Sequence, residues 1–250
     1  MVLNADVAEI CGIHAGDGYL RNDGHRIELD ISGHVEEQGY YDNHVVPLFS
    51  KTFHLPVKAR FFPHRNTYGF VIRDVDTVEL MHEFGFPYGA KSLTVKVPEF
   101  IMKNRALWPY FLKGYFDTDG CLFFCKRSSS SYSLFKRTRH YYPIIIFDTV
   151  SKDLASQLKV VFPYFDLPFR PYLYKPKKKT ENLRYVFHLS GIENLYRWLS
   201  VVGMSNPLQY SKFLIWEKYG FCPPKTTYQQ RLKILKGELN PNSCYKGPVA

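Results

Sequence analysis

The chain lacks most features of secreted, membrane and zinc-binding proteins. Its 250 residues contain only five cysteines, namely Cys11, Cys121, Cys125, Cys222 and Cys244. An odd number of cysteines without a CxxC pair argues against both a disulfide framework and a zinc site. The longest apolar runs are far shorter than a bilayer span, and the residues after Met1 do not resemble a signal peptide. We therefore expect a cytoplasmic protein, kept reduced, with no membrane partner.

Positive charge is plentiful but unevenly distributed. A hydrophobic content of 45% with 17% aromatic residues supports an ordinary folded core. The formal net charge of +10 divides into 10 basic against 14 acidic residues in 1–104, net −4, and 23 against 9 in 105–250, net +14. This asymmetry predicts a polyanionic partner that the second half binds more firmly than the first.

One short pattern occurs twice. Ala8 to Leu20 reads AEICGIHAGDGYL, and Trp108 to Leu122 reads WPYFLKGYFDTDGCL. Each copy predicts a helix that ends at an acidic residue followed by glycine. Small residues stand four apart in both copies, at Gly12 and Gly16 and at Gly114 and Thr118, so each helix has a narrow strip of small side chains on one face. Two such strips would allow the two helices to pack backbone against backbone.

Parallel packing of these helices would bring Asp17 and Asp119 together, each just before a glycine. A helix C-terminus already carries partial negative charge, so two carboxylates there repel unless a cation lies among them. Oxygen ligands without a Cys/His cluster favour Mg²⁺ over Zn²⁺, with Ca²⁺ or Mn²⁺ as substitutes. We predict Asp17, Asp119, Gly16 and Thr118 as the metal-binding residues. The alternative, that each acid only terminates its helix, is weakened by the second copy.

The two motifs resemble the LAGLIDADG homing endonucleases. GIHAGDG (Gly12 to Gly18) and GYFDTDG (Gly114 to Gly120) fall on the family signature, and two copies in one chain look like its monomeric, pseudo-symmetric branch. The first copy departs at Ala15, where the signature has an acid, whereas the second keeps Asp117. Because the last acid is the family's metal ligand, the departure affects helix capping more than chemistry. The resemblance implies cleavage of both strands across the minor groove, leaving short 3′ overhangs.

Beyond the motifs, the chain repeats one unit. Each copy predicts two hairpins and further helices in the order αββαββα, and the spacing between matching residues grows only where hairpin tips lengthen. The predicted class is α+β, with two four-stranded antiparallel sheets that form a DNA-binding saddle and motif helices at the interface. We divide the chain into a first half, 1–104, a second half, 105–220, and a C-terminal extension, 221–250. The extension predicts one short helix, either a covering element or a tail, without an assigned function.

Several residues are candidates for catalysis alongside the two aspartates. His34 and Asp148, taken as equivalent ends of the second strand in each unit, would orient the attacking water, although ordinary strand-end polar groups would look the same. Lys91 in GAKS looks like the family's basic residue near the scissile phosphate, and Gln209 is its counterpart by spacing. A solvated surface lysine is the competing explanation. His14 is predicted to pack rather than to act in catalysis.

DNA recognition is expected from the outward faces of the two sheets, because strand side chains on one face can follow the major groove. In the first half these residues are Arg21, Arg26, Glu28, Asp30, Arg60, Arg65, Tyr68 and Arg73. In the second half they are Lys126, Arg127, Arg137, Arg139, Arg170, Tyr172, Tyr174 and Arg184. The lysine run Lys175, Lys177, Lys178 and Lys179 suits phosphates better than bases, unless it is a solubilising loop.

The sequence thus favours a monomeric, Mg²⁺-dependent endonuclease that cuts double-stranded DNA at a long pseudo-palindromic site, of the type that promotes intron homing. A protein of a different class, an RNA maturase or a DNA-binding regulator on the same scaffold, is the alternative. Such proteins tend to lose the terminal acids, and both acids are present here. A relic that binds DNA without cutting it is a third hypothesis.

Overall fold

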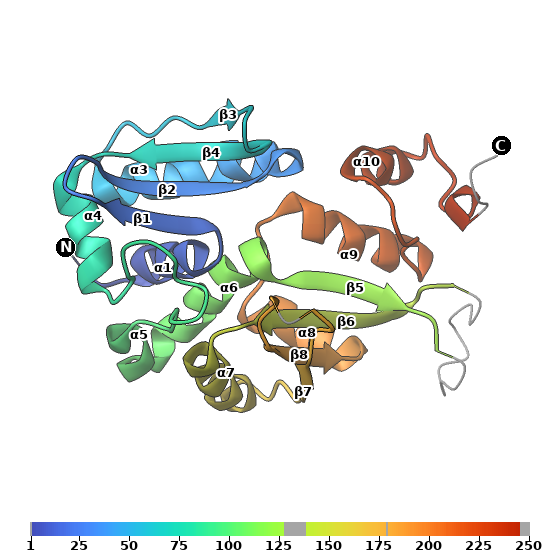
Figure 1. Cartoon of the computed structure of the whole chain (residues 1–250). Helices are drawn as coiled ribbons and strands as arrows, with labels where there is room; N and C mark the ends of the chain where they lie inside the picture. The colour runs from blue at the N-terminus through green and yellow to red at the C-terminus, as the bar shows by residue number, and fades with distance from the viewer. Residues whose placement is uncertain (1, 128–138, 179, 246–250) are drawn as a thin grey trace.

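The computed structural model describes residues 2–127, 139–178 and 180–245. The first unit contains α1 (Ala5–Asp17), β1 (Gly18–Asn22), β2 (Ile27–His34), α2 (Gln38–Tyr40), α3 (Val46–Phe53), β3 (Arg60–Phe62), β4 (Thr67–Ile72), α4 (Val75–Glu83) and α5 (Glu99–Lys103). The second contains α6 (Trp108–Asp119), β5 (Cys121–Cys125), β6 (Tyr142–Thr149), α7 (Lys152–Tyr164), β7 (Arg170–Tyr174), β8 (Arg184–Ser190) and α8 (Ile192–Val201). Two further helices follow, α9 (Pro207–Tyr219) and α10 (Tyr228–Lys236) (Figure 1).

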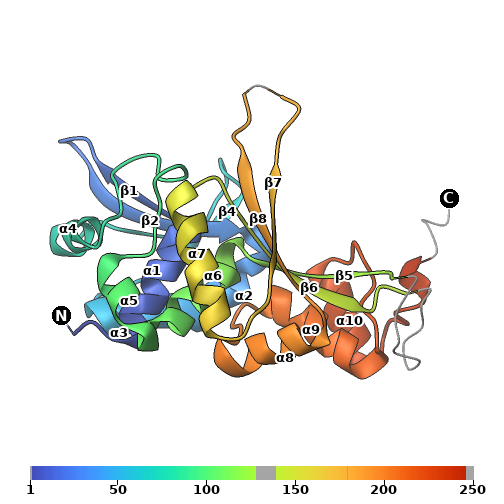
Figure 2. The same ribbon diagram turned by 90° about the horizontal axis from the view of Figure 1, so that it is seen from below.

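Each unit has one four-stranded antiparallel sheet. The strand orders are β1-β2-β4-β3 and β5-β6-β8-β7, so the second sheet repeats the topology of the first. This confirms the predicted α+β class with two pseudo-symmetric sheets. Viewed from below, the β1-β2 and β7-β8 hairpins rise from the same side of the molecule, above the helices (Figure 2). None of the helices in the described ranges is long and apolar enough to cross a membrane.

The strands alternate as the sequence predicts. In β2, Leu29 and Ile31 are fully buried against the helices, whereas Glu28 and Asp30 lie on the opposite face. Period-two alternation of this kind fixes which face of a strand enters the core, because successive side chains point to opposite sides. The outward face is therefore polar.

The segment between β2 and β3 is helical, as predicted, but it is not one regular helix. It begins with a 3₁₀ turn at Val35–Glu37 and passes through α2 and a π-helical turn at Tyr41–Val45 before α3. π-Helical turns change the direction of neighbouring side chains and occur often at functional sites. Here the turn includes Tyr41, whose hydroxyl reaches the end of α1.

The sequence did not predict α9. This helix buries residues such as Phe213, Ile215 and Trp216, and its apolar positions do not form a single stripe, which is the signal that reveals a surface helix. It covers the free edge of β5: the backbone N–H of Leu122 donates to Gln209 Oε1 (3.0 Å), and Lys212 Nζ donates to the carbonyl of Leu122 (3.1 Å). These bonds protect an edge strand that would otherwise expose unpaired backbone groups.

The short helix predicted in the C-terminal extension is confirmed as α10. It begins with a capping box between Thr227 and Gln230 and ends at Gly237, which has a positive φ of 82°. The buried Arg231 donates from Nε to Ser211 Oγ on α9 at 2.9 Å. Of the two structures proposed for the extension, a covering element is therefore the one observed.

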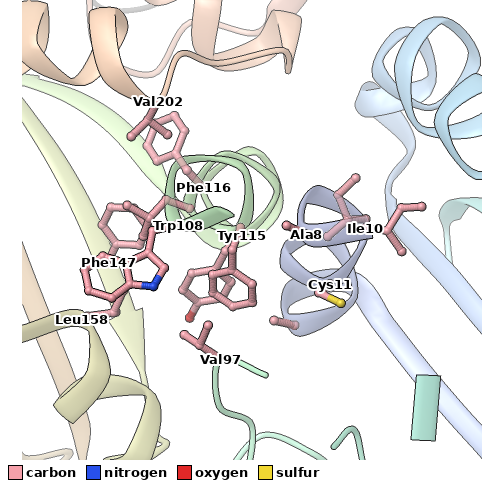
Figure 3. Close-up of a cluster of buried hydrophobic side chains, with 14 of the residues drawn as sticks. Ala8, Ile10, Cys11, Val97, Trp108, Tyr115, Phe116, Phe147, Leu158 and Val202 are labelled. Carbon is pink, nitrogen blue, oxygen red and sulfur yellow. The ribbon is translucent and has the colours of Figure 1, made fainter. Parts of the chain in front are cut away.

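The contact between α1 and α6 is the centre of the molecule, with apolar side chains from both units around it (Figure 3). A Cβ on Gly12 would lie 2.2 Å from the carbonyl oxygen of Phe111, and a Cβ on Gly114 would lie 2.2 Å from that of Glu9. The near-identity of the two contacts reflects the pseudo-twofold relation between the units. The predicted backbone-to-backbone packing is confirmed.

The glycines that follow the two acids have a different role from the one expected. Gly18 and Gly120 have φ values of −83° and −82°, so neither adopts the left-handed conformation of a typical helix-ending glycine. A Cβ on Gly18 would instead overlap the ring of His14, 2.0 Å from Nδ1, and one on Gly120 would overlap Phe116. Close packing, rather than backbone conformation, requires glycine at these two positions.

We predict that Gly114→Ala destabilises the protein by about 3 kcal/mol, because the added methyl group meets rigid backbone and the helices must separate. Gly39→Ala is the matched control, since a Cβ there meets no atom within 4 Å; it should change stability by less than about 0.5 kcal/mol. Urea unfolding of both variants measures the difference. Equal effects would show that the helix contact is less tight than described.

An ion cluster also joins the two motif helices. Glu9 on α1 is buried, accepts a hydrogen bond from His44 (2.5 Å) and pairs with Lys113 on α6 (3.1 Å). Burial raises the pKa of Glu9, but the hydrogen bond from His44 and the charge of Lys113 together outweigh it, so the pKa lies below its ordinary value of 4.5. The ionised carboxylate is therefore the form that stabilises the fold.

Because the folded-state pKa of Glu9 is lowered, its stabilising contribution is complete above pH 4.5 and disappears as the pH falls through the folded value. We expect Glu9→Gln to reduce the free energy of unfolding by about 2 kcal/mol at pH 7 and by progressively less as the pH falls below 4.5. Glu79→Gln, at an exposed acid on α4, is the control. A Glu9→Gln penalty that stays constant across this pH range would contradict the assignment.

Candidate active site

The carboxyl ends of α1 and α6 lie side by side, and the two candidate acids meet there. The carboxyl carbon of Asp119 lies only 3.3 Å from the point where a Cβ on Gly16 would be, and Thr118 Oγ1 lies 2.1 Å from that point. Asp119 also acts electrostatically on Asp17, raising its pKa. The expected proximity is thus observed, whereas the role of the two residues remains a prediction.

The carboxylate of Asp17 is in an unfavourable electrostatic environment. Burial raises its pKa well above the ordinary value, and the charges of Glu37 and Asp119 raise it further. A hydrogen bond from Tyr41 to Oδ2 (2.7 Å) and the charge of Lys91 lower the pKa without cancelling these effects. A bound cation would reduce this electrostatic cost, because a nearby opposite charge favours the ionised form of the Asp17 carboxylate.

Asp119 has a different set of neighbours. Part of the residue is exposed, but its carboxyl group is desolvated by the surrounding protein, which raises its pKa. The charge of Lys91 lowers this pKa, and the charge of Asp148 raises it. Together with Arg184, these residues line a cavity of about 240 Å³. The cavity therefore combines two acids with two basic side chains, a composition suited to a phosphate and a cation together.

Lys91 reaches the motif ends, as the prediction requires. Its Nζ donates to the carbonyl of Gly16 at 2.7 Å. Burial lowers the pKa of Lys91, whereas the charges of Asp119 and Asp17 raise it. Lys91 is therefore a partly buried cation at the acid pair, which argues against a solvated surface lysine.

Gln209 is placed differently from Lys91. Its carboxamide oxygen accepts from the N–H of Leu122 and from Lys212 Nζ, and its amide nitrogen lies 3.4 Å from the carbonyl of Gly120. These bonds hold α9 against β5 and leave the amide little freedom to act on a substrate. The structure therefore gives Gln209 an edge-covering role, and the match with Lys91 by spacing does not extend to function.

The expected equivalence of His34 and Asp148 is wrong. Gly18 pairs with Ile31 in the first sheet, and Cys121 pairs with Ile146 in the second, so Gly120 faces Phe147. Counting from these pairs, Asp148 corresponds to Ser32 and not to His34. A register difference of two residues moves a side chain along the sheet without changing its face, which sequence spacing could not resolve.

The two strand-end residues also differ in their contacts. His34 is exposed, and its Nδ1 accepts from the backbone N–H of Glu36 at the start of the following helical turn. Asp148 accepts from Arg184 (2.7 Å); burial raises its pKa and this Arg184 contact lowers it. Asp148 therefore faces the Asp119 cavity, whereas His34 caps a helical turn.

Sequence reasoning missed a polar network at the Asp17 end of the site. Asn206 caps α9 and is fully buried; its side-chain amide donates to Glu37 Oε1 (2.8 Å) and to the carbonyl of Asp117 (2.7 Å). Asp117 Oδ2 accepts from the N–H of Ser205, and burial raises the pKa of Asp117 to about 7. Asp117 thus holds the start of α9, in agreement with a capping rather than a chemical role. The sequence signal was the Ser-Asn-Pro helix start.

The donor set fits a divalent cation that also binds substrate. In the described ranges no three His, Cys, Asp or Glu side chains are grouped as a complete metal site, but Mg²⁺ commonly uses one or two carboxylates together with phosphates and water. Asp17 and Asp119 each supply one carboxylate, so each acid can hold one cation together with phosphate and water. Gly16 and Thr118, the other two residues predicted to bind the metal, already form hydrogen bonds within the protein. The Gly16 carbonyl accepts from Lys91, and the Thr118 hydroxyl donates to carbonyls of its own helix.

His14 is packed, as expected. It is fully buried with its ring 4.4 Å from that of Phe86, and burial lowers its pKa well below the ordinary value. Neither ring nitrogen has a hydrogen-bond partner in the part of the chain that the structure describes. A neutral imidazole in such surroundings serves packing.

On the outward face of the first sheet, three of the predicted arginines are paired with acids. Arg21 contacts Asp23 and Glu28, Arg65 contacts Asp30 (2.7 Å), and Arg73 contacts Glu28 (3.4 Å). These pairs leave the arginines partly neutralised, in agreement with the acidic balance of the first half. Arg60 stacks on Phe62, and Arg26 is exposed.

Tyr68 does not lie on this face. It shares the side of β4 that carries the buried Phe70 and Ile72, its ring packs against Tyr41, and its hydroxyl donates to Asp42 (2.8 Å). The prediction that Tyr68 lies on the outward face of the sheet is therefore wrong, and its contact with DNA stays a prediction. Tyr68 lies near the start of β4 and is half-buried, so the alternation of polar and apolar residues did not indicate which face of the strand it occupies.

The second sheet presents a more strongly basic surface. Every residue of β7 is exposed. Arg170 lies opposite His188 in the register of β7 and β8, and the hydroxyl of Tyr172 forms a hydrogen bond with His188. The guanidinium group of Arg184 stacks on the ring of Tyr174. Lys175, Lys177 and Lys178 continue this surface beyond the strand. Of these three lysines, only Lys178 is close to an acidic side chain of the described residues, with its Nζ 3.8 Å from Glu181 Oε1.

The remaining basic candidates lie near the C-terminal extension. Lys126 and Arg127 are exposed, with Arg127 3.8 Å from the centre of the Tyr142 ring. Arg139 stacks on Tyr245 at 4.5 Å and is only partly exposed. The predicted contacts Arg137 and Lys179 lie outside the described residues.

The two-sheet architecture has counterparts among solved structures. A structure of mesophilic variants from the homing endonuclease I-DmoI is similar over 80% of this chain and 95% of its own, with a TM-score of 0.51 and 14% identity. A mutant of I-SmaMI is similar over 88% and 90%, with a TM-score of 0.51 and 9% identity. The chain has the fold of the LAGLIDADG homing endonucleases. A third structure with this fold, I-DmoI in complex with DNA and Mn, covers 80% of the chain and 96% of its own at a TM-score of 0.50 and 14% identity.

The similarity is one of fold and not of sequence. No protein-family model and no curated protein matches the chain. The homing endonuclease fold nevertheless agrees with the resemblance found in the two motifs, because α1 and α6 form the central helix pair and the two sheets repeat one topology.

Proposed function

We propose that the chain is a site-specific endonuclease that binds double-stranded DNA and hydrolyses one phosphodiester in each strand with the help of divalent cations. The observation that carries this proposal is the meeting of Asp17 and Asp119 at the paired carboxyl ends of α1 and α6, one acid from each unit. We call the surroundings of Asp17 and of Asp119 the two poles of the site. Because the poles are related by the pseudo-twofold symmetry, each suits one of the two antiparallel DNA strands. The solved structure of I-DmoI with DNA and Mn supports the choice of substrate and metal.

The surface supports a duplex as the substrate. The β1-β2 and β7-β8 hairpins rise on the same side of the molecule (Figure 2), and we infer that the outward faces of both sheets contact one duplex there. The strongly basic face of β7 and β8 would supply phosphate contacts, and the charged pairs on and beside β1 and β2 would supply donors and acceptors for base edges. We infer a long target, because each sheet would cover one half-site and the protein needs no second copy.

The site residues have distinct parts in this proposal. Asp17 and Asp119 would hold Mg²⁺, which polarises a phosphate, lowers the pKa of bound water and stabilises the leaving oxygen. Lys91 lies between the two acids and would contact a phosphate oxygen at the cavity that Asp119 and Asp148 line. Arg184 holds Asp148 in place, and Asp148 can accept a hydrogen bond from the attacking water.

We expect Asp17→Asn and Asp119→Asn each to abolish cutting of one strand and to leave nicking of the other, because each acid serves one pole. The assay is conversion of supercoiled plasmid carrying the uninterrupted host gene into open-circular and linear forms with Mg²⁺, followed by strand-specific end labelling. The double variant should produce neither form. EDTA should prevent cleavage by the unaltered protein.

Binding must be measured in the same experiment. Retained duplex binding by the Asp17→Asn/Asp119→Asn variant would show that loss of cleavage is chemical and not structural. Full linearisation by either single variant, or no cut by the unaltered protein at any position of the host gene, would contradict the proposal. Tight binding to an intron transcript without DNA cleavage would favour the maturase alternative.

A further inference from the structure

The end of β2 has an unusual environment at Gly33. A Cβ placed there would lie 2.4 Å from Glu37 Oε2 and 2.7 Å from Asp17 Oδ2. The strand position nearest to Asp17 therefore has no room for a side chain, and the carboxylate of Glu37 takes that space. Because both oxygens are this close to one point, they are separated by at most about 5 Å.

Glu37 is fixed from both units. Its Oε2 accepts from the N–H of His34 at 3.0 Å, as half of a capping box, and its Oε1 accepts from the side-chain amide of Asn206 at 2.8 Å. Asn206 is fully buried and is bound to the second motif helix through Asp117. Both hydrogen-bond partners of the Glu37 carboxylate are neutral donors that fix its orientation. Burial raises the pKa of Glu37, the hydrogen bonds from Asn206 and His34 lower it, and the charge of Asp119 raises it.

Asp17 is left with one free oxygen. Tyr41 donates to Oδ2, on the side of Gly33 and Glu37, and no residue of the described ranges donates to Oδ1. The hydrogen bond from Tyr41 and the repulsion from Glu37 thus restrict how the carboxylate can rotate. Oδ1 is the atom that remains available to a cation.

The Asp119 pole has no counterpart of this arrangement. By strand register Thr149 corresponds to Gly33, and its hydroxyl accepts from the N–H of Ser151. The acid near Asp119 is Asp148, which is paired with Arg184. One pole therefore has an unpaired carboxylate beside its metal ligand, and the other has an acid neutralised by arginine.

We propose that Glu37 is a positioning residue for Asp17, beside which its carboxylate is fixed, and that this carboxylate orients Asp17 and strengthens cation binding at that pole. This inference rests on the proposed endonuclease function and goes further, because it makes cutting of one DNA strand depend on a residue that the other strand does not need. Residues that orient a metal ligand without touching the metal typically change metal affinity or activity by roughly tenfold to hundredfold.

The test is Glu37→Gln, which keeps the shape of the side chain and removes its charge. It also replaces one carboxylate oxygen, a hydrogen-bond acceptor, with an amide group that donates toward an N–H group. The strand that Asp17→Asn protects should be cut roughly tenfold to hundredfold more slowly, and the other strand within about twofold of the normal rate. Glu36→Gln is the matched control, since Glu36 is the neighbouring exposed acid. It should leave both strand rates unchanged.

Cation binding supplies a readout independent of cleavage. Calorimetric titration of Ca²⁺ into DNA complexes of Asp119→Asn and of Asp119→Asn/Glu37→Gln should give roughly tenfold weaker binding in the second case. The reciprocal pair, Asp17→Asn and Asp17→Asn/Glu37→Gln, should give equal affinities. Thermal unfolding of each variant checks that the fold is retained.

The outcomes separate this inference from the proposed function. Equal slowing of both strands by Glu37→Gln, or no slowing of either, would overturn the positioning role while the endonuclease function stands. Failure of the unaltered protein to cut any strand would remove the proposed function itself. Slowing of one strand with unchanged Ca²⁺ affinity would overturn the part of the inference that concerns cation binding.

Discussion

The backbone contact between α1 and α6 is the constraint on which the rest of the structure depends. Gly12 and Gly114 leave no room for a side chain between the two helices, so the helices cross in a single arrangement. Because both helices run in the same direction along this contact, their carboxyl ends coincide. The position of the two aspartates is thus a consequence of packing in the core, about one and a half helical turns away from them.

The same packing creates an electrostatic cost at the site. Two helix ends, two motif acids and Glu37 gather negative charge where burial already disfavours ionisation, and Lys91 is the cation placed among them. Proteins tolerate such concentrations of like charge where a ligand compensates for them. The ion cluster of Glu9, His44 and Lys113, near the middle of the helix pair, holds the units together without requiring a ligand.

Pseudo-symmetry in the fold does not extend to the chemistry. The two sheets share strand order and register, but the first carries arginines paired with acids, whereas the second carries exposed basic and aromatic residues. The poles differ as well, with Glu37 and Tyr41 at Asp17 and with Lys91, Asp148 and Arg184 at Asp119. A duplicated unit can keep its backbone, which packing fixes, while side chains on the outward face change at little cost to stability. An asymmetric site of this kind suits a target whose two halves differ.

The sequence by itself determined the repeat, the fold class and the pairing of the motif helices. Small residues at Gly12, Gly16 and Gly114 record the helix contact directly, and alternation in β2 records which face is buried. The motifs also placed Asp17 and Asp119 at the ends of the two helices, and the family resemblance pointed to Lys91, whose Nζ reaches the carbonyl of Gly16. These signals are local: each can be recognised within about two turns of helix or one strand.

Only the tertiary structure decided which residues from distant segments meet. The place of Glu37 beside Asp17 depends on the absence of a side chain at Gly33 and on Asn206, which is 169 residues away along the chain. The edge-covering role of Gln209, the inward position of Tyr68 and the correspondence of Asp148 with Ser32 depend on strand register. Local periodicity carries no information about register or about contacts across the interface between units, because both are fixed by the packing of complete elements.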